Sequence, residues 1–183
     1  MASVLLLGIL GVLVLWGIVI YNGLVRDRNR TASAWSDIDV QLQRRHDLIP
    51  RLVEAVRAYA TYERATLEAV TELRARSEQT QQVARIAELE HQIEAGVRRL
   101  VALAEDYPDL KADRNFLDLQ QELTDVEDHL QYARRYYNGA VRLFNTRIQS
   151  FPDLLVARPL GFAEAEFFDA DPEAEAAVKV ELG

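Results

Sequence analysis

Seventeen consecutive residues near the start of the chain, 4–20, carry no charged or strongly polar side chain. A helix of about 17 to 25 apolar residues crosses roughly 30 Å of hydrocarbon, and a helix satisfies all backbone polar groups within one segment. A cleaved signal peptide would have basic residues before the run and a small-x-small site after it, and the sequence has neither. We therefore predict an uncleaved transmembrane helix over residues 1–21, with a cleaved signal or an interfacial helix as alternatives.

The residues just after the apolar run predict the orientation of this helix. Arg26, Arg28 and Arg30 lie there, whereas only three uncharged residues precede the run. Basic residues favour the cytoplasmic side, and tyrosine is enriched at the interface. We define Tyr21, Arg26, Arg28 and Arg30 as the membrane collar. The prediction is a single-pass protein of the bacterial inner membrane, with its N-terminus outside and the rest of the chain in the cytoplasm.

The net charge of -8 is concentrated at the C-terminus. Residues 153–183 contain eight acidic and two basic side chains, a net of -6, so residues 1–152 carry only -2. Nucleic-acid binding needs a basic surface that displaces counterions, so we exclude nucleic acid as a partner. The chain has no cysteine, which excludes disulfides, thiolate metal sites and lipoprotein anchoring.

Apolar residues recur at helical spacing along the remainder of the chain. Alternating steps of three and four residues indicate helices that face partner helices, as in coiled coils. The longest such run is Phe116, Leu119, Leu123, Val126, Leu130, Ala133, Tyr137, Ala140 and Phe144. Shorter runs are Trp35, Ile38 and Leu42; Ile49, Leu52 and Val56, continuing less regularly to Val70 and Leu73; and Val83, Ile86, Leu89, Ile93, Val97 and Leu100.

Capping chemistry sets the expected boundaries of four helices, at about 22–47, 48–78, 81–105 and 113–150. Asp47 can cap the second helix with Pro50 in its first turn, and Asp113 can cap the fourth. Tyr107-Pro108 breaks the chain before the fourth helix, and Phe151-Pro152 follows it. Residues 77–82 are polar and lose the apolar period, so we expect a turn there, with one very long helix as the alternative. The first helix is expected to run unbroken out of the membrane.

Short connections favour antiparallel neighbours. The predicted fold class is therefore all-α: a transmembrane helix that continues into an up-down-up-down helical bundle over residues 22–152, followed by a tail. This order places the end of the fourth helix, near residues 145–152, beside the membrane collar.

The motif Y-N-G-x-V-R-x-x-N occurs twice, at residues 21–29 and at residues 137–145. A polar Asn in a helix seam can fix register or oligomer state, although chance similarity of two helix surfaces is the alternative. On this basis we predict a helix-packing or assembly role for Asn22, Asn29, Trp35, Tyr137, Asn138 and Asn145.

The tail, residues 153–183, divides into an apolar part and an acidic end. The apolar part is expected to pack on the bundle, to lie on the bilayer or to bind a neighbouring protomer. Its candidate interface residues are Leu154, Leu155, Phe162, Phe167 and Phe168. Asp171-Pro172-Glu173 can start one short helix before an acidic end.

The stretch of residues 21–53, above all A-W-S-D-I-D-V-Q-L-x-R-R-x-D-L-I-P, resembles the LemA family, as do Y-P-D-L-K-A, N-F-L-D-L-Q and A-R-R-Y-Y-N further along. The resemblance implies one N-terminal span, an antiparallel helical bundle in the cytoplasm and no catalytic residues. Some members of the family belong to magnetosome membrane formation, which points toward membrane organisation. Arg51 and Tyr62 stand where the family often has Asn and His.

The residues themselves suggest no enzyme, catalytic residue, metal, cofactor or small-molecule substrate. A di-iron bundle needs two Glu-x-x-His pairs, and only Glu88 with His91 has that spacing. His46, His91 and His129 are expected to be isolated surface histidines. We predict a non-enzymatic scaffold or self-assembling protein that organises the membrane or its partners at the cytoplasmic face. Its expected partners are the lipid bilayer, copies of itself and other membrane proteins; a regulatory or signalling subunit of a membrane complex is the alternative.

Overall fold

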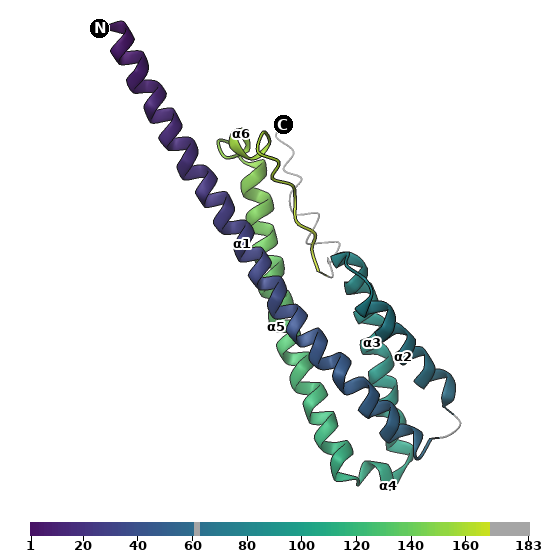
Figure 1. The fold of residues 1–183 in the computed structure, drawn as a ribbon. Coiled ribbons are helices and arrows are strands. Elements are labelled where there is room, and N and C mark those ends of the chain that lie inside the picture. The colour runs from purple at the N-terminus through teal and green to yellow at the C-terminus, as the bar shows by residue number, and fades with distance from the viewer. Residues whose placement is uncertain (61–62, 169–183) are drawn as a thin grey trace, which may run out of the picture. The chain divides into compact units, whose positions relative to one another are not determined.

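The computed structural model describes residues 1–60 and 63–168, and these residues form helices and no strand. The predicted all-α fold class is confirmed at this level. The elements are α1 (Ala2–Arg57), α2 (Arg64–Glu78), α3 (Val83–Leu103), the 3-10 turn η1 (Ala104–Asp106), α4 (Pro108–Lys111), α5 (Arg114–Gln149) and α6 (Leu154–Ala157), as Figure 1 shows.

Helix α1 runs without a break from the apolar segment to Arg57, with Pro50 inside it. The expected continuation out of the apolar segment is confirmed, whereas the corner predicted at Asp47 is wrong. Proline removes one hydrogen bond from a helix and crowds the preceding turn. Here Pro50 is exposed, while Ile49 and Leu52 on either side of it in the sequence are buried. Burial of these residues keeps the helix intact.

The other helix boundaries lie closer to those predicted from the sequence. The expected second helix, residues 48–78, is replaced by the end of α1 and by α2, with residues 61–62 outside the described part of the chain. A turn separates α2 from α3 at residues 79–82, so the alternative of one long helix is excluded. The N-cap predicted at Asp113 is confirmed, because its Oδ1 accepts a hydrogen bond from the backbone N–H of Phe116 at 3.0 Å.

The described chain divides into two compact units. The first unit contains Met1–Ser36 and Arg135–Glu166; the second contains Asp37–Arg134 with Phe167 and Phe168. Within the first unit, Asp27 contacts Arg147 and Trp35 contacts Tyr137. Residue numbers therefore rise along α1 as they fall along α5, so the two segments run in opposite directions there.

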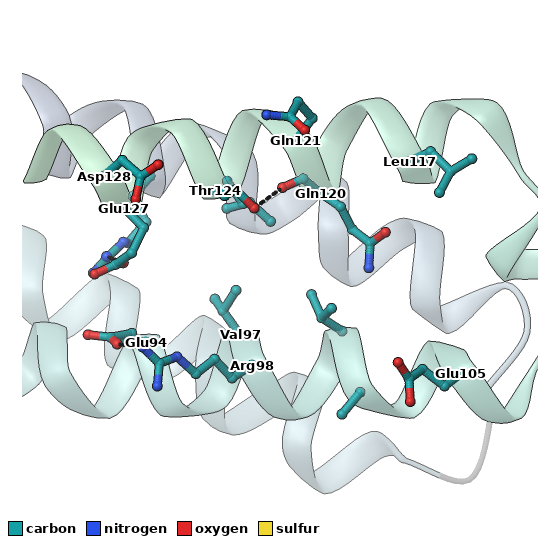
Figure 2. A pocket seen from close by; sticks show the side chains of 14 residues that line it. Glu94, Val97, Arg98, Glu105, Leu117, Gln120, Gln121, Thr124, Glu127 and Asp128 are labelled. Carbon is teal, nitrogen blue, oxygen red and sulfur yellow. Dashed lines mark hydrogen bonds and ion pairs between the residues drawn. The ribbon is translucent and has the colours of Figure 1, made fainter.

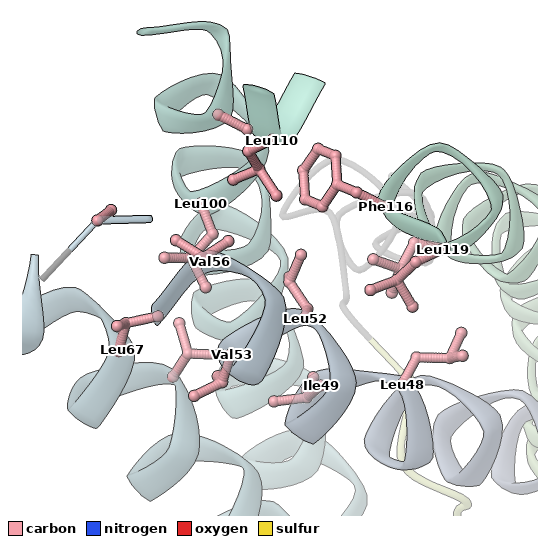
Figure 3. Close-up of a cluster of buried hydrophobic side chains, with 14 of the residues drawn as sticks. Leu48, Ile49, Leu52, Val53, Val56, Leu67, Leu100, Leu110, Phe116 and Leu119 are labelled. Atoms are coloured by element: carbon pink, nitrogen blue, oxygen red, sulfur yellow. The ribbon is translucent and has the colours of Figure 1, made fainter. Parts of the chain in front are cut away.

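The second unit is built around one apolar core from α1, α2, α3 and α5, shown in Figure 3. Antiparallel α2 and α3 lie side by side (Figure 1), with Ser77 bonded to Glu90. Gly96 lets α3 approach α2 closely, because a Cβ there would collide with Val70. The core includes residues of the predicted apolar runs, namely Ile49, Leu52, Val56, Val70, Ile93, Leu100, Phe116, Leu119, Leu123 and Val126, together with residues outside those runs, such as Leu48, Val53, Leu67 and Leu110.

Candidate functional site

The first part of α1 is the one segment of residues 1–60 and 63–168 that is long and apolar enough to cross a membrane. Its large side chains, from Val4 to Val19, are exposed in the folded chain. The core helix of a water-soluble protein would bury such side chains. The segment therefore fits a membrane anchor.

Immediately after this segment, an ionic cluster of Asp27, Arg147 and Asp153 joins α1 to the end of α5. The Arg147 guanidinium donates to Asp27 Oδ2 at 2.7 Å and to Asp153 through Nε. These hydrogen bonds, that to Asp27 foremost, raise the pKa of Arg147. Gly23 makes room for the guanidinium, because a Cβ at this position would collide with it. Part of the repeated motif thus lies at the predicted meeting point of α1 and α5.

Two seam residues of α5 hold residues 153–166, which we call the strap. The Asn145 side chain donates to the backbone oxygen of Ala165 and accepts from its N–H, both at 2.9 Å. The Tyr137 hydroxyl donates to the Glu166 backbone oxygen at 2.8 Å. Burial, together with the Glu166 carboxylate, raises the pKa of Tyr137 to about 12. The Trp35 ring lies 5.6 Å from that of Tyr137. In the first unit the strap therefore packs on the helices.

Of the six predicted packing or assembly residues, Trp35 and Tyr137 contact each other, and Asn145 binds the strap as Tyr137 does. Asn138 is half-buried, whereas Asn22 and Asn29 are exposed on α1. The two copies of the motif have different environments: Asn145 is buried and binds the strap, while its counterpart Asn29 faces outward. Any role of the exposed pair in assembly stays a prediction.

The collar residues pack on aromatic rings of the first unit. The Arg28 guanidinium lies 5.4 Å from the Phe162 ring centre, and Tyr21 meets the same ring edge-on at 6.0 Å. Arg30 lies over Tyr136 at 5.5 Å and donates to its hydroxyl at 3.3 Å. These contacts hold two of the arginines close to the end of the apolar segment. Arg26 is exposed.

The predicted tail-interface residues are split between different environments. Phe162 packs in the first unit with Ile20 and Phe144, and Leu154 is half-buried. Leu155 is exposed. In the second unit Phe168 is fully buried, with Arg134 over its ring at 5.1 Å, and Phe167 is half-buried. The short helix expected at Asp171-Pro172-Glu173 and the acidic end lie outside the described residues.

A second polar site lies inside the second unit, where α1, α2, α3 and α5 meet around Glu90. This carboxylate is fully buried and accepts hydrogen bonds from Ser77 at 2.6 Å and Arg45 at 3.2 Å, and it is bonded to His46 at 2.7 Å. Arg45 also pairs with Glu127. We call these five residues the buried ionic cluster. The expectation that His46 is a surface histidine is wrong, because its ring is buried against Glu90.

Burial alone would raise the pKa of Glu90, but its partners reverse that effect. The hydrogen bond and charge of His46, the hydrogen bond of Ser77 and the charge of Arg45 together lower this pKa. The sequence does hold a signal for the site. Arg45 occupies the seam position between Leu42 and Ile49, and Glu90 lies beside the seam residue Leu89, four residues after Ile86 and three before Ile93. Opposite charges on the apolar faces of two helices are the signal for a buried ion pair.

Figure 2 shows a groove of about 770 Å³ between α3 and α5 in the second unit. Its lining includes the apolar residues Val97, Val101 and Leu123 and the charged residues Glu94, Arg98, Glu105 and Asp128. The described residues include no group of three or more His, Asp or Glu side chains placed to hold a metal ion. Glu88 and His91, the pair with di-iron spacing, are both exposed on α3.

The family model of the LemA family matches residues 34–182. This chain belongs to the LemA family. It is 30% identical to the protein LemA of Metamycoplasma hominis in an alignment of 154 positions that covers 81% of this chain and 68% of that protein.

Two magnetosome proteins are also similar to this member of the LemA family. They are MamQ 1 and MamQ 2 of Paramagnetospirillum magneticum, each 25% identical in an alignment of 178 positions that covers 83% of this chain and 65% of the relative. The chain thus spans about two thirds of the length of these curated relatives.

Proposed function

We propose that this protein is a membrane-anchored, non-enzymatic scaffold that assembles with copies of itself or with other membrane proteins. It organises the membrane or its associated proteins at the cytoplasmic face of the inner membrane. One observation carries the proposal: α1 is a single helix from the apolar segment to Arg57, so no flexible linker separates the anchor from the helical region. Within the first unit, α1 therefore connects the apolar segment directly to the residues that pack on α5 and the strap.

The relatives support the same role. Two of them are magnetosome proteins by name, and we infer a membrane-organising role for this chain. We further infer an up-down-up-down bundle, supported by the antiparallel contacts of α1 with α5 in the first unit and of α2 with α3 in the second. The N-terminus lies outside, because Arg26, Arg28 and Arg30 follow the span.

Self-assembly is tested by the mass of the protein after extraction in a mild detergent and in nanodiscs. The full chain is compared with a chain that ends at Phe168. A deletion at residue 153 is unsuitable, because it removes the Ala165 backbone that Asn145 binds. We expect one defined oligomer larger than a monomer for both chains. A monodisperse monomer in detergent and in lipid would contradict the scaffold function.

The cysteine-free sequence makes the orientation directly measurable. One cysteine is placed at Ala2 in one variant and at the exposed Gln79 in another, and intact cells are treated with an impermeant thiol reagent. We expect labelling at Ala2 and none at Gln79. The reverse pattern would place the helical region outside the cytoplasm.

The alternative is a regulatory or signalling subunit of a membrane complex, favoured by the buried ionic cluster. Buried charges that link several helices are more typical of an element that switches between two discrete arrangements than of an element selected for stability alone. Affinity capture of the full chain from membranes separates the two functions. A regulatory subunit brings down one stoichiometric partner, whereas a scaffold brings down its own copies.

A further inference from the structure

Three large apolar side chains within residues 151–160, on and beside α6, are exposed: Phe151 at 77%, Leu155 at 56% and Leu160 at 57%. We call these three residues the apolar cap. Single exposed apolar residues are ordinary on protein surfaces. Several exposed apolar residues on one short segment indicate a surface that contacts a lipid bilayer or another protein.

The position of this segment indicates that the lipid bilayer contacts this surface. Ala157, at the end of α6, and Val156 pack with Ile20 and Leu24 of α1 in one apolar cluster. Ile20 is the last residue of the apolar run that fits a membrane anchor. Figure 1 likewise shows α6 at the end of α5, beside α1. The cap therefore lies at the level where α1 leaves the hydrocarbon.

The segment is held in this position from both ends. Asp153 is paired with Arg147 of α5. After α6, the backbone N–H of Phe162 bonds to the Ala157 oxygen at 3.1 Å, and the Phe162 ring packs on Tyr21. The cap residues are thus fixed in an exposed arrangement that orders the cap before it meets a partner.

The charges around the cap suit a lipid surface. Asp153 is the single carboxylate in residues 150–163 and is paired with Arg147, which also pairs with Asp27; the next carboxylate, Glu164, accepts a hydrogen bond from Gln149. Arg158 is exposed between two cap residues, and Arg28 lies over Phe162. Apolar side chains beside arginine, without an unpaired carboxylate, are the combination found at bilayer interfaces.

We propose that Phe151, Leu155 and Leu160 insert into the interfacial layer of the bilayer that α1 spans, with Arg158 at the lipid phosphates. This inference rests on the membrane anchor of the proposed function. The insertion is shallow, on the order of 5–10 Å, as for amphipathic surface helices. The protein then has two contacts with the membrane, and the second one fixes the tilt and rotation of α1 that a lone span leaves free.

The test uses the full chain in nanodiscs of phosphatidylcholine and phosphatidylglycerol. Single cysteines introduced by L155C and L160C carry an environment-sensitive fluorophore, and nitroxide lipids with shallow or deep labels act as quenchers. L10C, within the span, reports on the anchor. A32C is the matched control, because Ala32 is exposed on α1 about 18 Å beyond Ile20. Circular dichroism verifies that each variant keeps its helix content.

We expect blue-shifted emission at both cap positions and quenching by shallow nitroxides at least about threefold stronger than at A32C, given the shallow depth of interfacial residues. If the cap positions are quenched no more than A32C while L10C is quenched by deep nitroxides, insertion of the apolar cap is rejected and the membrane anchor still stands. An unquenched L10C would overturn both. A blue shift that appears with several protein copies per nanodisc, and is absent with one, would assign the cap to protomer contacts and also overturn the proposal.

Discussion

The Arg147 guanidinium donates to the Asp27 carboxylate at 2.7 Å, joining residues 120 positions apart in the sequence. This pair connects the end of α5 to α1 seven residues after the apolar run. The same guanidinium holds Asp153 at the start of the strap. One arginine therefore positions α1, α5 and the strap in the first unit.

Arg147→Met tests this role. Hydrogen bonds to charged groups contribute about 1.5–3 kcal/mol, so we expect the free energy of unfolding to fall by about 2 kcal/mol when both partners of Arg147 are left unpaired. Thermal unfolding in detergent, followed by circular dichroism, measures the change. Arg142→Met, an exposed position on the same helix, is the control, with less than about 0.5 kcal/mol expected. Equal effects of the two variants would show that the ionic cluster does not stabilise the protein.

The two glycines of the repeated motif are expected to respond differently to alanine. Nothing lies within 4 Å of a Cβ added at Gly139, so G139A stabilises the exposed helix by about 0.5–1 kcal/mol. At Gly23 the added Cβ displaces the Arg147 guanidinium. We therefore expect G23A to lack the stabilisation predicted for G139A and to weaken the contact between Arg147 and Asp27. Unfolding of both variants under identical conditions measures the difference, and a G23A variant as stable as G139A would contradict it.

The buried ionic cluster predicts an acid-sensitive contribution to stability. The folded-state pKa of Glu90 lies below its ordinary value of 4.5, so its ionised form stabilises the fold at and above that pH. The contribution is lost as the pH falls through the lowered value. E90Q removes the charge and is expected to cost about 3 kcal/mol at neutral pH, the lower end for breaking a buried pair, because Glu127 still pairs with Arg45.

Unfolding of wild type and E90Q is compared between pH 7 and pH 3. We expect the stability gap between them to be constant above about pH 5 and to shrink below about pH 4, as Glu90 takes up a proton. A gap that stays constant down to pH 3 would mean that the charge of Glu90 does not contribute.

Asn145→Ala is expected to release the strap. Two hydrogen bonds to Ala165 are lost, each worth about 0.5–1.5 kcal/mol. The backbone at Glu164 then opens more often, so cleavage there by a glutamate-specific protease becomes several-fold faster, roughly in proportion to the open population. Asn29→Ala, the exposed counterpart in the repeated motif, should leave the cleavage rate unchanged. Equal rates in both variants would contradict a strap held by Asn145.

Local patterns in the sequence predicted much of the fold. The alternating three- and four-residue spacing of α5, from Phe116 to Phe144, predicted the buried face that the structure has. Asp113 predicted the start of α5, because a cap is set by its own hydrogen bond to the next turn. The helix break predicted at Asp47 is wrong. Local capping chemistry favoured a break there, but the burial of residues on both sides of Pro50 in the sequence keeps α1 continuous.

The apolar run at residues 4–20 was determined by the sequence alone, since its length and lack of charge do not depend on any other part of the chain. The environments of the polar side chains outside this run were decided by the tertiary structure. Whether Asn145 or Asn29 binds the strap, and whether His46 is buried or exposed, depends on which helix faces each side chain. That pairing brings together residues dozens of positions apart, such as Arg45 with Glu90 and Asp27 with Arg147. Helical periodicity fixes the face of a residue but not its partner, and the partner decides whether a buried charge is satisfied.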